Sequence, residues 1–134
     1  MKTFAYTLEL KDDPAAIEKY KSYHKAVWPE VLQSIRKSGV QRSKIFLLGT
    51  RLFLLVEADD DYEADQLQDY TAGAREIEWD ELMRTYQVPV SEAKPGEWWA
   101  EMELVYDLES QLAKLKNTEG GQSEGREKLE KNNQ

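Results

Sequence analysis

The sequence contains no cysteine and only one histidine, His24, among its 134 residues. The lack of cysteine excludes disulfide frameworks, thiol nucleophiles and cysteine-ligated metal sites. A single histidine excludes a histidine pair for zinc, and the chain carries no HExxH or GxSxG motif and no Rossmann or P-loop glycine pattern. We therefore expect no metal and no cofactor. The chemistry that remains within reach is proton transfer.

Long hydrophobic runs and an excess of basic charge are also missing. No apolar run approaches the roughly 20 residues that a bilayer span requires. The first residues, MKTFAYTLELKDD, alternate apolar and polar side chains and so predict a strand, not a signal peptide. The formal charge of −8 would repel a phosphate backbone. We expect a soluble, cytoplasmic protein that binds a small neutral molecule, with no nucleic acid or membrane as partner.

The hydropathy pattern predicts alternating strands and helices. Apolar side chains recur with a period of two in the strands and at helical spacing between them. Pro29 should make the first helix bend or restart near Trp28. The predicted elements are a strand at 4–10, a helix from 14 to a stop at Gly39, a hairpin of strands at 44–48 and 52–58, helical pieces at 62–70 and 74–86, and a last strand at 98–108.

This order of elements predicts an α+β class with the ferredoxin-like βαββαβ arrangement. Helices would cover one face of the sheet. The strand segments IFLL and LFLLV are apolar on both faces, so the other face needs a partner. We expect two sheets to pack face to face in a homodimer, as a dimeric α+β barrel. The domain should span residues 1–110, because the composition from 111 to 134 is that of a flexible polar tail.

Tyr20, His24 and Trp28 are spaced at i, i+4 and i+8, which brings their side chains to nearly the same face of a helix. One interpretation is a packed core stripe. The other is an active site, because an imidazole titrates near neutral pH, a phenol donates or accepts a hydrogen bond, and an indole stacks on a ligand ring. The spacing alone leaves both interpretations open.

A second candidate pair is Glu78 with Trp79. A carboxylate beside an indole can hold a sugar, the ring stacking while the acid accepts from hydroxyl groups. Glu78 could equally pair with Arg75 on a solvated helix surface. The pair Trp98 and Trp99 is typical of a sheet edge or a dimer seam, with a ligand role as the alternative.

The segment YKSYHKAVWPEV, residues 20–31, resembles the Y-x-x-x-H-x-x-x-W-P-E segment of the L-rhamnose mutarotase family. The resemblance continues through Gly39, the strand RLFLLVE at 51–57 and the turn K-P-G-E-x-W at 94–99, and covers about residues 3–108. It implies a dimeric α+β barrel that isomerises sugars. It also implies that His24 is the proton donor.

The same resemblance implies a set of substrate contacts. The rhamnose enzymes have a tyrosine and a tryptophan where this chain has Ser43 and Glu78, and these departures, with the segments YQ, KPGE and GTRLF, resemble the branch associated with L-fucose. The substrate-binding residues expected here are Tyr20, Trp28, Ser43, Glu78 and Trp79.

The function that the resemblance implies is interconversion of the α and β anomers of a 6-deoxy-L-hexose, L-fucose or L-rhamnose, by general acid and base ring opening. Two alternatives stay open. The same fold hosts haem-type monooxygenases, in which His24 would be an axial ligand, and a sugar or metabolite sensor without catalysis would use the same pocket.

Overall fold

The computed structural model describes residues 1–63 and 73–117. The chain divides into two compact units, Met1–Glu103 and Leu104–Gln134, which are described separately. The first unit contains β1 (Lys2–Leu10), α1 (Pro14–His24), α2 (Pro29–Lys37), β2 (Val40–Leu48), β3 (Arg51–Ala58), α3 (Ala74–Arg84), β4 (Gln87–Val88) and β5 (Ala100–Glu101), and the second contains α4 (Leu108–Asn117).

The strands of the first unit form one antiparallel sheet in the order β2-β3-β1-β4, with β5 also paired to β1. The first crossover, between β1 and β2, carries α1 and α2, and α3 lies in the crossover between β3 and β4. This strand order and connectivity are those of the ferredoxin-like split βαβ arrangement. The predicted α+β class and ferredoxin-like order are therefore confirmed.

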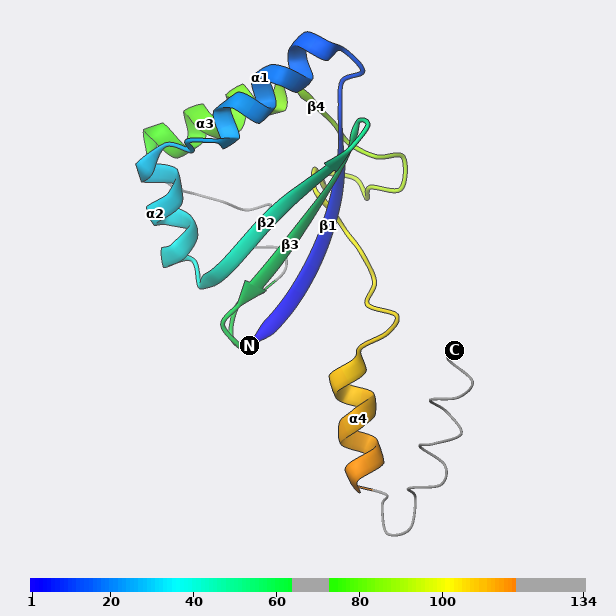
Figure 1. Cartoon of the computed structure of the whole chain (residues 1–134). Helices are drawn as coiled ribbons and strands as arrows, with labels where there is room; N and C mark the ends of the chain where they lie inside the picture. Colours follow the sequence, from blue (N-terminus) through cyan, green and yellow to red (C-terminus); the bar gives the residue numbers. More distant parts are fainter. Residues whose placement is uncertain (64–72, 118–134) are drawn as a thin grey trace. The chain divides into compact units, whose positions relative to one another are not determined.

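The helices of the first unit lie on one side of the sheet (Figure 1). Side chains that point to that side from β1 and β3 alternate with exposed or half-buried ones, as expected of a strand with one buried face. Leu8 and Leu52 are almost fully buried there against helix residues. The core cluster on this side comprises Leu8, Leu10, Tyr20, Val31, Leu52, Trp79 and Met83.

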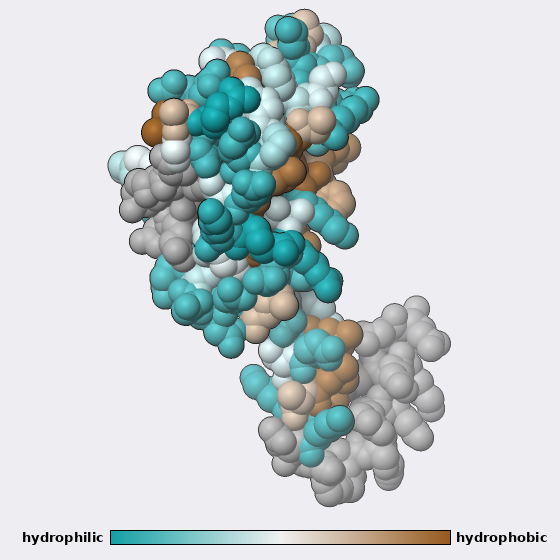
Figure 2. Space-filling model, turned by 90° about the vertical axis from the view of Figure 1, so that its left-hand side faces the viewer, coloured by the Kyte–Doolittle hydropathy of each residue, from teal (hydrophilic) through white to brown (hydrophobic). Residues whose placement is uncertain are grey.

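The opposite side of the sheet remains apolar and partly open. Phe46 of β2 and Phe53 of β3 are register partners whose ring centroids lie 6.0 Å apart. Phe46 is 53% exposed, and Leu48 near the end of β2 is 85% exposed. By contrast, the side of this unit that faces the viewer in Figure 2 is largely hydrophilic.

The predicted first helix is two helices, with the break between His24 and Pro29. Asp13 caps α1 by accepting a hydrogen bond from the backbone N–H of Ala15 at 3.2 Å. Trp28 has an extended ψ of 137°, because the ring of the following proline disfavours the helical conformation there. The helix therefore restarts at Pro29, which is one of the two outcomes that the sequence predicted.

Glycines end α2 and turn the hairpin, as predicted. Gly39 follows the C-cap of α2 with a φ of 106°, a conformation that favours glycine. Gly49, with a φ of 62°, and Thr50 form the two-residue turn between β2 and β3. The strand β2 begins earlier than predicted, at Val40, and contains a register shift between Val40 and Arg42.

The predicted last strand at 98–108 is wrong over most of its length. Only Ala100 and Glu101 are assigned to a strand, paired with Thr7 and Tyr6 of β1. An alternating pattern marks residues that suit a strand, but a ladder also needs a neighbour. Residues 104–107 have no ladder partner within the described part of the chain.

The helix α4 of the second unit extends through Asn117, so residues 111–117 are helical where the sequence predicted a flexible tail. Asp107 caps this helix by accepting from the backbone N–H of Ser110 at 3.2 Å. The domain boundary at 110 stays a prediction. The predicted helical piece from residue 64 to 70 and the tail beyond 117 lie outside the described residues.

Within residues 1–63 and 73–117, no helix has the length and apolar character needed to cross a membrane.

Candidate active site

His24 is the last residue of α1 and is half-buried among aromatic rings. Its ring centroid lies 4.3 Å from that of Tyr20, one helical turn earlier, and 5.4 Å from that of Trp79 on α3, in an edge-to-face arrangement. The i, i+4 spacing therefore does bring the phenol and the imidazole together. The imidazole is not sealed among aliphatic side chains.

The hydrogen bonding of His24 fixes which of its nitrogens can react. Nδ1 lies 2.9 Å from the backbone carbonyl oxygen of Tyr20. A carbonyl oxygen only accepts, so Nδ1 carries the hydrogen and the neutral ring keeps a free lone pair on Nε2. Burial lowers the pKa of His24 from its usual 6.5, and the bond to Tyr20 opposes that change only in part. At pH 7 the imidazole is therefore a neutral base.

Tyr20 is the complementary group, a phenol that stays protonated. Its side chain is only 3% exposed, and Gln87 Nε2 donates a hydrogen bond to its hydroxyl oxygen at 3.1 Å. Burial raises the pKa of Tyr20 to about 12, although the bond from Gln87 acts in the opposite direction. A neutral base and a protonated acid thus lie side by side on one turn of α1.

Gln87 and Trp98 complete this network, although Gln87 was not predicted as a site residue and Trp98 only as an alternative. Trp98 Nε1 donates to Gln87 Oε1 at 2.7 Å. Pairing of Gln87 with Leu10 in the sheet brings the amide next to α1. In the sequence, the segment YQ of the family resemblance contains Gln87, and the segment KPGE directly precedes Trp98. Only the pairing of β1 with β4 shows that Gln87 lies beside α1.

One indole, Trp79, borders the imidazole, and a second, Trp28, packs against Trp79. Trp79 is 8% exposed and packs edge-to-face against Trp28 with ring centroids 5.1 Å apart. Trp28 has left the helix because of Pro29, yet it still reaches the same cluster. The guanidinium carbon of Arg75 lies 3.8 Å from the centroid of the Trp28 ring, so one indole face is already covered.

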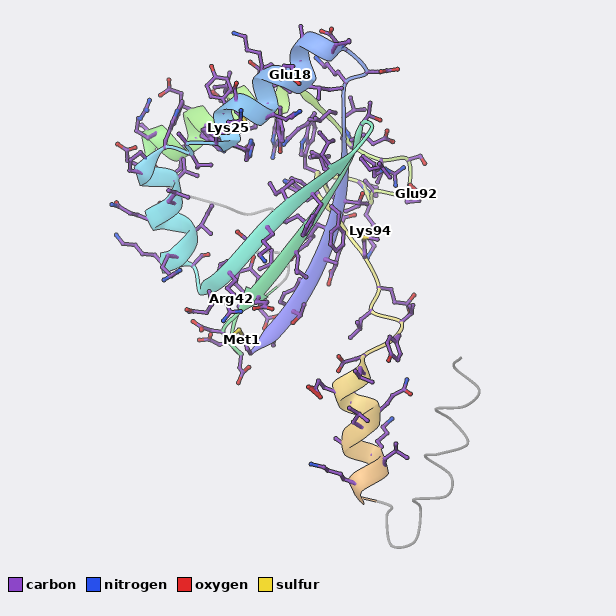
Figure 3. All side chains as sticks on the ribbon, in the orientation of Figure 1. Met1, Glu18, Lys25, Arg42, Glu92 and Lys94 are labelled. Atoms are coloured by element: carbon purple, nitrogen blue, oxygen red, sulfur yellow. The ribbon has the colours of Figure 1, made fainter. Side chains whose placement is uncertain are left out.

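Glu78 and Ser43 both occupy exposed positions, and Glu78 connects to the aromatic cluster through Arg75, which covers Trp28. Glu78 is exposed, and its carboxylate pairs with Arg75 at 3.0 Å, which matches the surface alternative raised from the sequence. Ser43 is exposed on β2 beside Val56, which belongs to a second core cluster. In Figure 3 the residue after His24, Lys25, and the residue before Ser43, Arg42, are well separated. The substrate roles of Ser43 and Glu78 stay predictions.

The buried carboxylate of α3 is Glu76, which is 8% exposed. It accepts a hydrogen bond from the hydroxyl of Ser34 on α2, and this bond lowers the pKa of Glu76. The pair links α2, which follows Trp28, to α3, which carries Trp79. We assign it a structural role.

Comparison with known proteins agrees with this fold and with the sequence pattern. Residues 3–108 match the L-rhamnose mutarotase family. A UPF0734 protein of Dictyostelium discoideum is 45% identical over 113 residues, covering 81% of this chain and 90% of that protein. An L-fucose mutarotase of Xanthomonas campestris is 34% identical over 111 residues, covering 81% of this chain and 89% of that protein.

A solved structure, the L-rhamnose mutarotase FA22100 of Formosa agariphila, shares the fold with a TM-score of 0.59 at 19% identity, over 81% of this chain and 99% of that one. The family match covers most of the chain, and two relatives are more than 30% identical over most of their own length. The chain belongs to the L-rhamnose mutarotase family.

Proposed function

We propose that this protein is a mutarotase, a carbohydrate isomerase that interconverts the α and β anomers of a 6-deoxy-L-hexose. The observation that carries the proposal is the pair of His24 and Tyr20, whose imidazole and phenol centroids lie 4.3 Å apart, in a chain of this family. The similarity to an L-fucose mutarotase over most of both chains supports L-fucose as a substrate. The family match supports L-rhamnose as the other candidate.

The reaction opens and closes the ring hemiacetal. His24 Nε2 removes the proton of the anomeric hydroxyl, the electron pair forms the C1 carbonyl, and the bond between C1 and the ring oxygen breaks. The ring oxygen receives a proton from Tyr20. After rotation about C1–C2 the same steps run in reverse, so that His24 is the proton donor to the C1 oxygen and each group regains its starting protonation state. Such acid and base help is worth about a hundred to ten thousand fold.

Tyr20 suits the second proton better than Glu78. Its phenol is protonated over the whole neutral range and lies 4.3 Å from the His24 ring, centroid to centroid. The Glu78 carboxylate is exposed and held by Arg75. We therefore assign the proton delivered to the ring oxygen to Tyr20.

The two indoles fit the proposed class of substrate. A 6-deoxy sugar carries a methyl group at C5, which favours an apolar wall. Trp28 is partly exposed and packs against Trp79 next to the imidazole. We assign the methyl group to the side of this indole pair.

The exposed apolar side of the sheet supports a homodimer. Phe46 and Leu48 leave large apolar surface uncovered, and Phe46 continues it to Phe53 on the neighbouring strand. Packing of this surface against a second copy would remove it from water. The acidic, cysteine-free composition fits a cytoplasmic protein.

The test is the anomer exchange rate measured by saturation-transfer NMR on L-fucose, L-rhamnose and D-galactose over a pH range from about 5 to 8. The proposal expects faster exchange of a 6-deoxy-L-hexose than the uncatalysed rate at the same pH. Binding of these sugars without any acceleration would favour the sensor interpretation instead.

A further inference from the structure

We infer that Gln87 and Trp98 are positioning residues that set the direction of the hydrogen bond at the Tyr20 hydroxyl, and so make Tyr20 a proton donor to the sugar. This inference rests on the proposed function. It concerns residues outside the segment that holds Tyr20, His24 and Trp28. The two residues act through Tyr20 and need not touch the sugar.

Trp98 sets the donor-to-acceptor direction of both hydrogen bonds of Gln87, because an indole N–H can only donate. It donates to Gln87 at 2.7 Å, so the atom of the amide that faces Trp98 must be the carbonyl oxygen. The amide nitrogen therefore faces Tyr20, where it lies 3.1 Å from the hydroxyl oxygen. Since that nitrogen donates, the Tyr20 oxygen accepts, and the hydroxyl hydrogen is free to go to another acceptor.

Sheet pairing and contacts from α3 hold Gln87 and Trp98 in place. Gln87 is only 6% exposed, and its backbone pairs with Leu10 in the sheet. The guanidinium carbon of Arg84 lies 4.7 Å from the centroid of the Trp98 ring, and Asp80 fixes that guanidinium with an ion pair of 3.0 Å. The indole is thus held at its face by α3 and at its edge by Gln87.

A reversed amide would change the chemistry. With its oxygen toward Tyr20, the amide would accept the phenol hydrogen and withdraw it from the sugar. It would also turn its NH₂ group toward the Trp98 N–H, so that two donors would face each other in a buried place. Trp98 therefore selects the amide orientation in which Tyr20 is a donor to the substrate.

The decisive variant is Q87E, which keeps the shape of the side chain. Its carboxylate still accepts from Trp98 but now also accepts from Tyr20, so the direction of the second bond reverses. We expect kcat for anomer exchange to fall at least about tenfold, with KM changed less than about threefold. Q87M removes both bonds without adding an acceptor for the phenol hydrogen, so its loss should be smaller than that of Q87E. Q33E makes the same chemical change at an exposed position of α2 and should keep the wild-type rate.

Double variants separate a positioning role from a merely structural one. In a Y20F background, Q87E should lower kcat by less than about twofold, because the group through which Gln87 acts is already missing. Losses that multiply in Y20F/Q87E, or a Q87E protein with wild-type kcat, would overturn the inference. Circular dichroism and Tm of each variant check the fold, and Q87M replaces Q87E if the carboxylate prevents folding.

A measurement without sugar keeps this inference separable from the proposed function. The indole N–H signal of Trp98, assigned by its absence in W98F, should exchange slowly with solvent in the wild type and faster in Q87M. If the wild type does not accelerate anomer exchange, the proposed function and the role given to Tyr20 both fail. If exchange is accelerated but the Trp98 signal is unchanged in Q87M, the hydrogen-bonded network is wrong and the function stands.

Discussion

The backbone carbonyl of Tyr20 accepts a hydrogen bond from Nδ1 of His24 at 2.9 Å, and the two rings lie 4.3 Å apart, centroid to centroid. One residue therefore supplies both the acceptor that orients the base and the phenol that acts as the acid. A single helical turn is enough to set up the proton transfers of the proposed reaction.

The pH dependence of exchange should follow His24. The neutral imidazole is the active base, and burial lowers its pKa below 6.5. The rate should therefore stay level from about pH 8 down past 6.5 and decrease only as the pH falls through the lowered pKa. Because the pKa of Tyr20 is raised to about 12, no decrease is expected on the alkaline side up to about pH 10.

Folding stability should change in the same direction. The unfolded chain binds the His24 proton near the usual pKa of 6.5, before the folded chain does. The contribution to the free energy of unfolding is thus fully present above pH 6.5 and is lost as the pH falls through the lower pKa of the folded chain.

For the anomer exchange rate, a pH profile with its midpoint above 6.5 would contradict a neutral His24 base.

Two variants identify the side chain that delivers the proton to the ring oxygen. Y20F removes the phenol hydrogen and should lower kcat by about tenfold or more, with some loss of stability because the buried Gln87 N–H loses its acceptor. E78Q breaks only the exposed pair with Arg75, which is worth less than about 1 kcal/mol. Anomer exchange rates of both proteins, with Tm as the control, assign the role. A larger loss in E78Q than in Y20F would transfer the second proton to Glu78.

The sequence predicted the arrangement of the fold better than the details of its edges. Strand alternation and helical spacing report which face of an element is buried, and these were enough for the β2-β3-β1-β4 order. Residues 104–107 carried a strand-like pattern, but a pattern does not tell whether a neighbouring strand is present. The capped turn at Asp107 is a local signal, but the composition from residue 111 onward favoured a flexible tail.

The candidate site was predicted where its residues are close in sequence. Tyr20 and His24 are one turn apart on one helix, so their contact follows from spacing. The Gln87 contact spans 67 positions and depends on the pairing of a two-residue strand, which no local pattern reveals. Ser43 was predicted from the family resemblance and Glu78 from its place beside Trp79 as well, and each occupies an exposed position in this chain.

Removal of part of the apolar wall formed by Trp28 and Trp79 should have a modest effect on sugar preference. W28A removes the partly exposed indole and should lower the preference for L-fucose over L-galactose, which has a hydroxyl group in place of the methyl hydrogen. Burial of one methyl group is worth about 0.8 kcal/mol, so kcat/KM should change about fourfold between the two sugars. W28F keeps an aromatic wall and serves as the control. An unchanged ratio in W28A would mean that the methyl group lies elsewhere.

The proposed homodimer depends on the uncovered side of the sheet. F46K places a charge in the middle of that apolar surface and should shift the protein to monomer at micromolar concentration, as measured by light scattering after size-exclusion chromatography. The control Q33K adds the same charge to the exposed side of α2. A wild-type protein that is monomeric at all concentrations, or an F46K dimer as stable as the wild type, would exclude this surface as the interface.

Comparison of the wild type with H24N by saturation-transfer NMR on L-fucose near neutral pH tests most directly whether the imidazole of His24 carries the proposed anomer exchange. We predict that the wild type accelerates exchange and that H24N loses about a hundredfold or more of that acceleration while remaining folded. An H24N protein that exchanges the anomers as fast as the wild type would contradict the account.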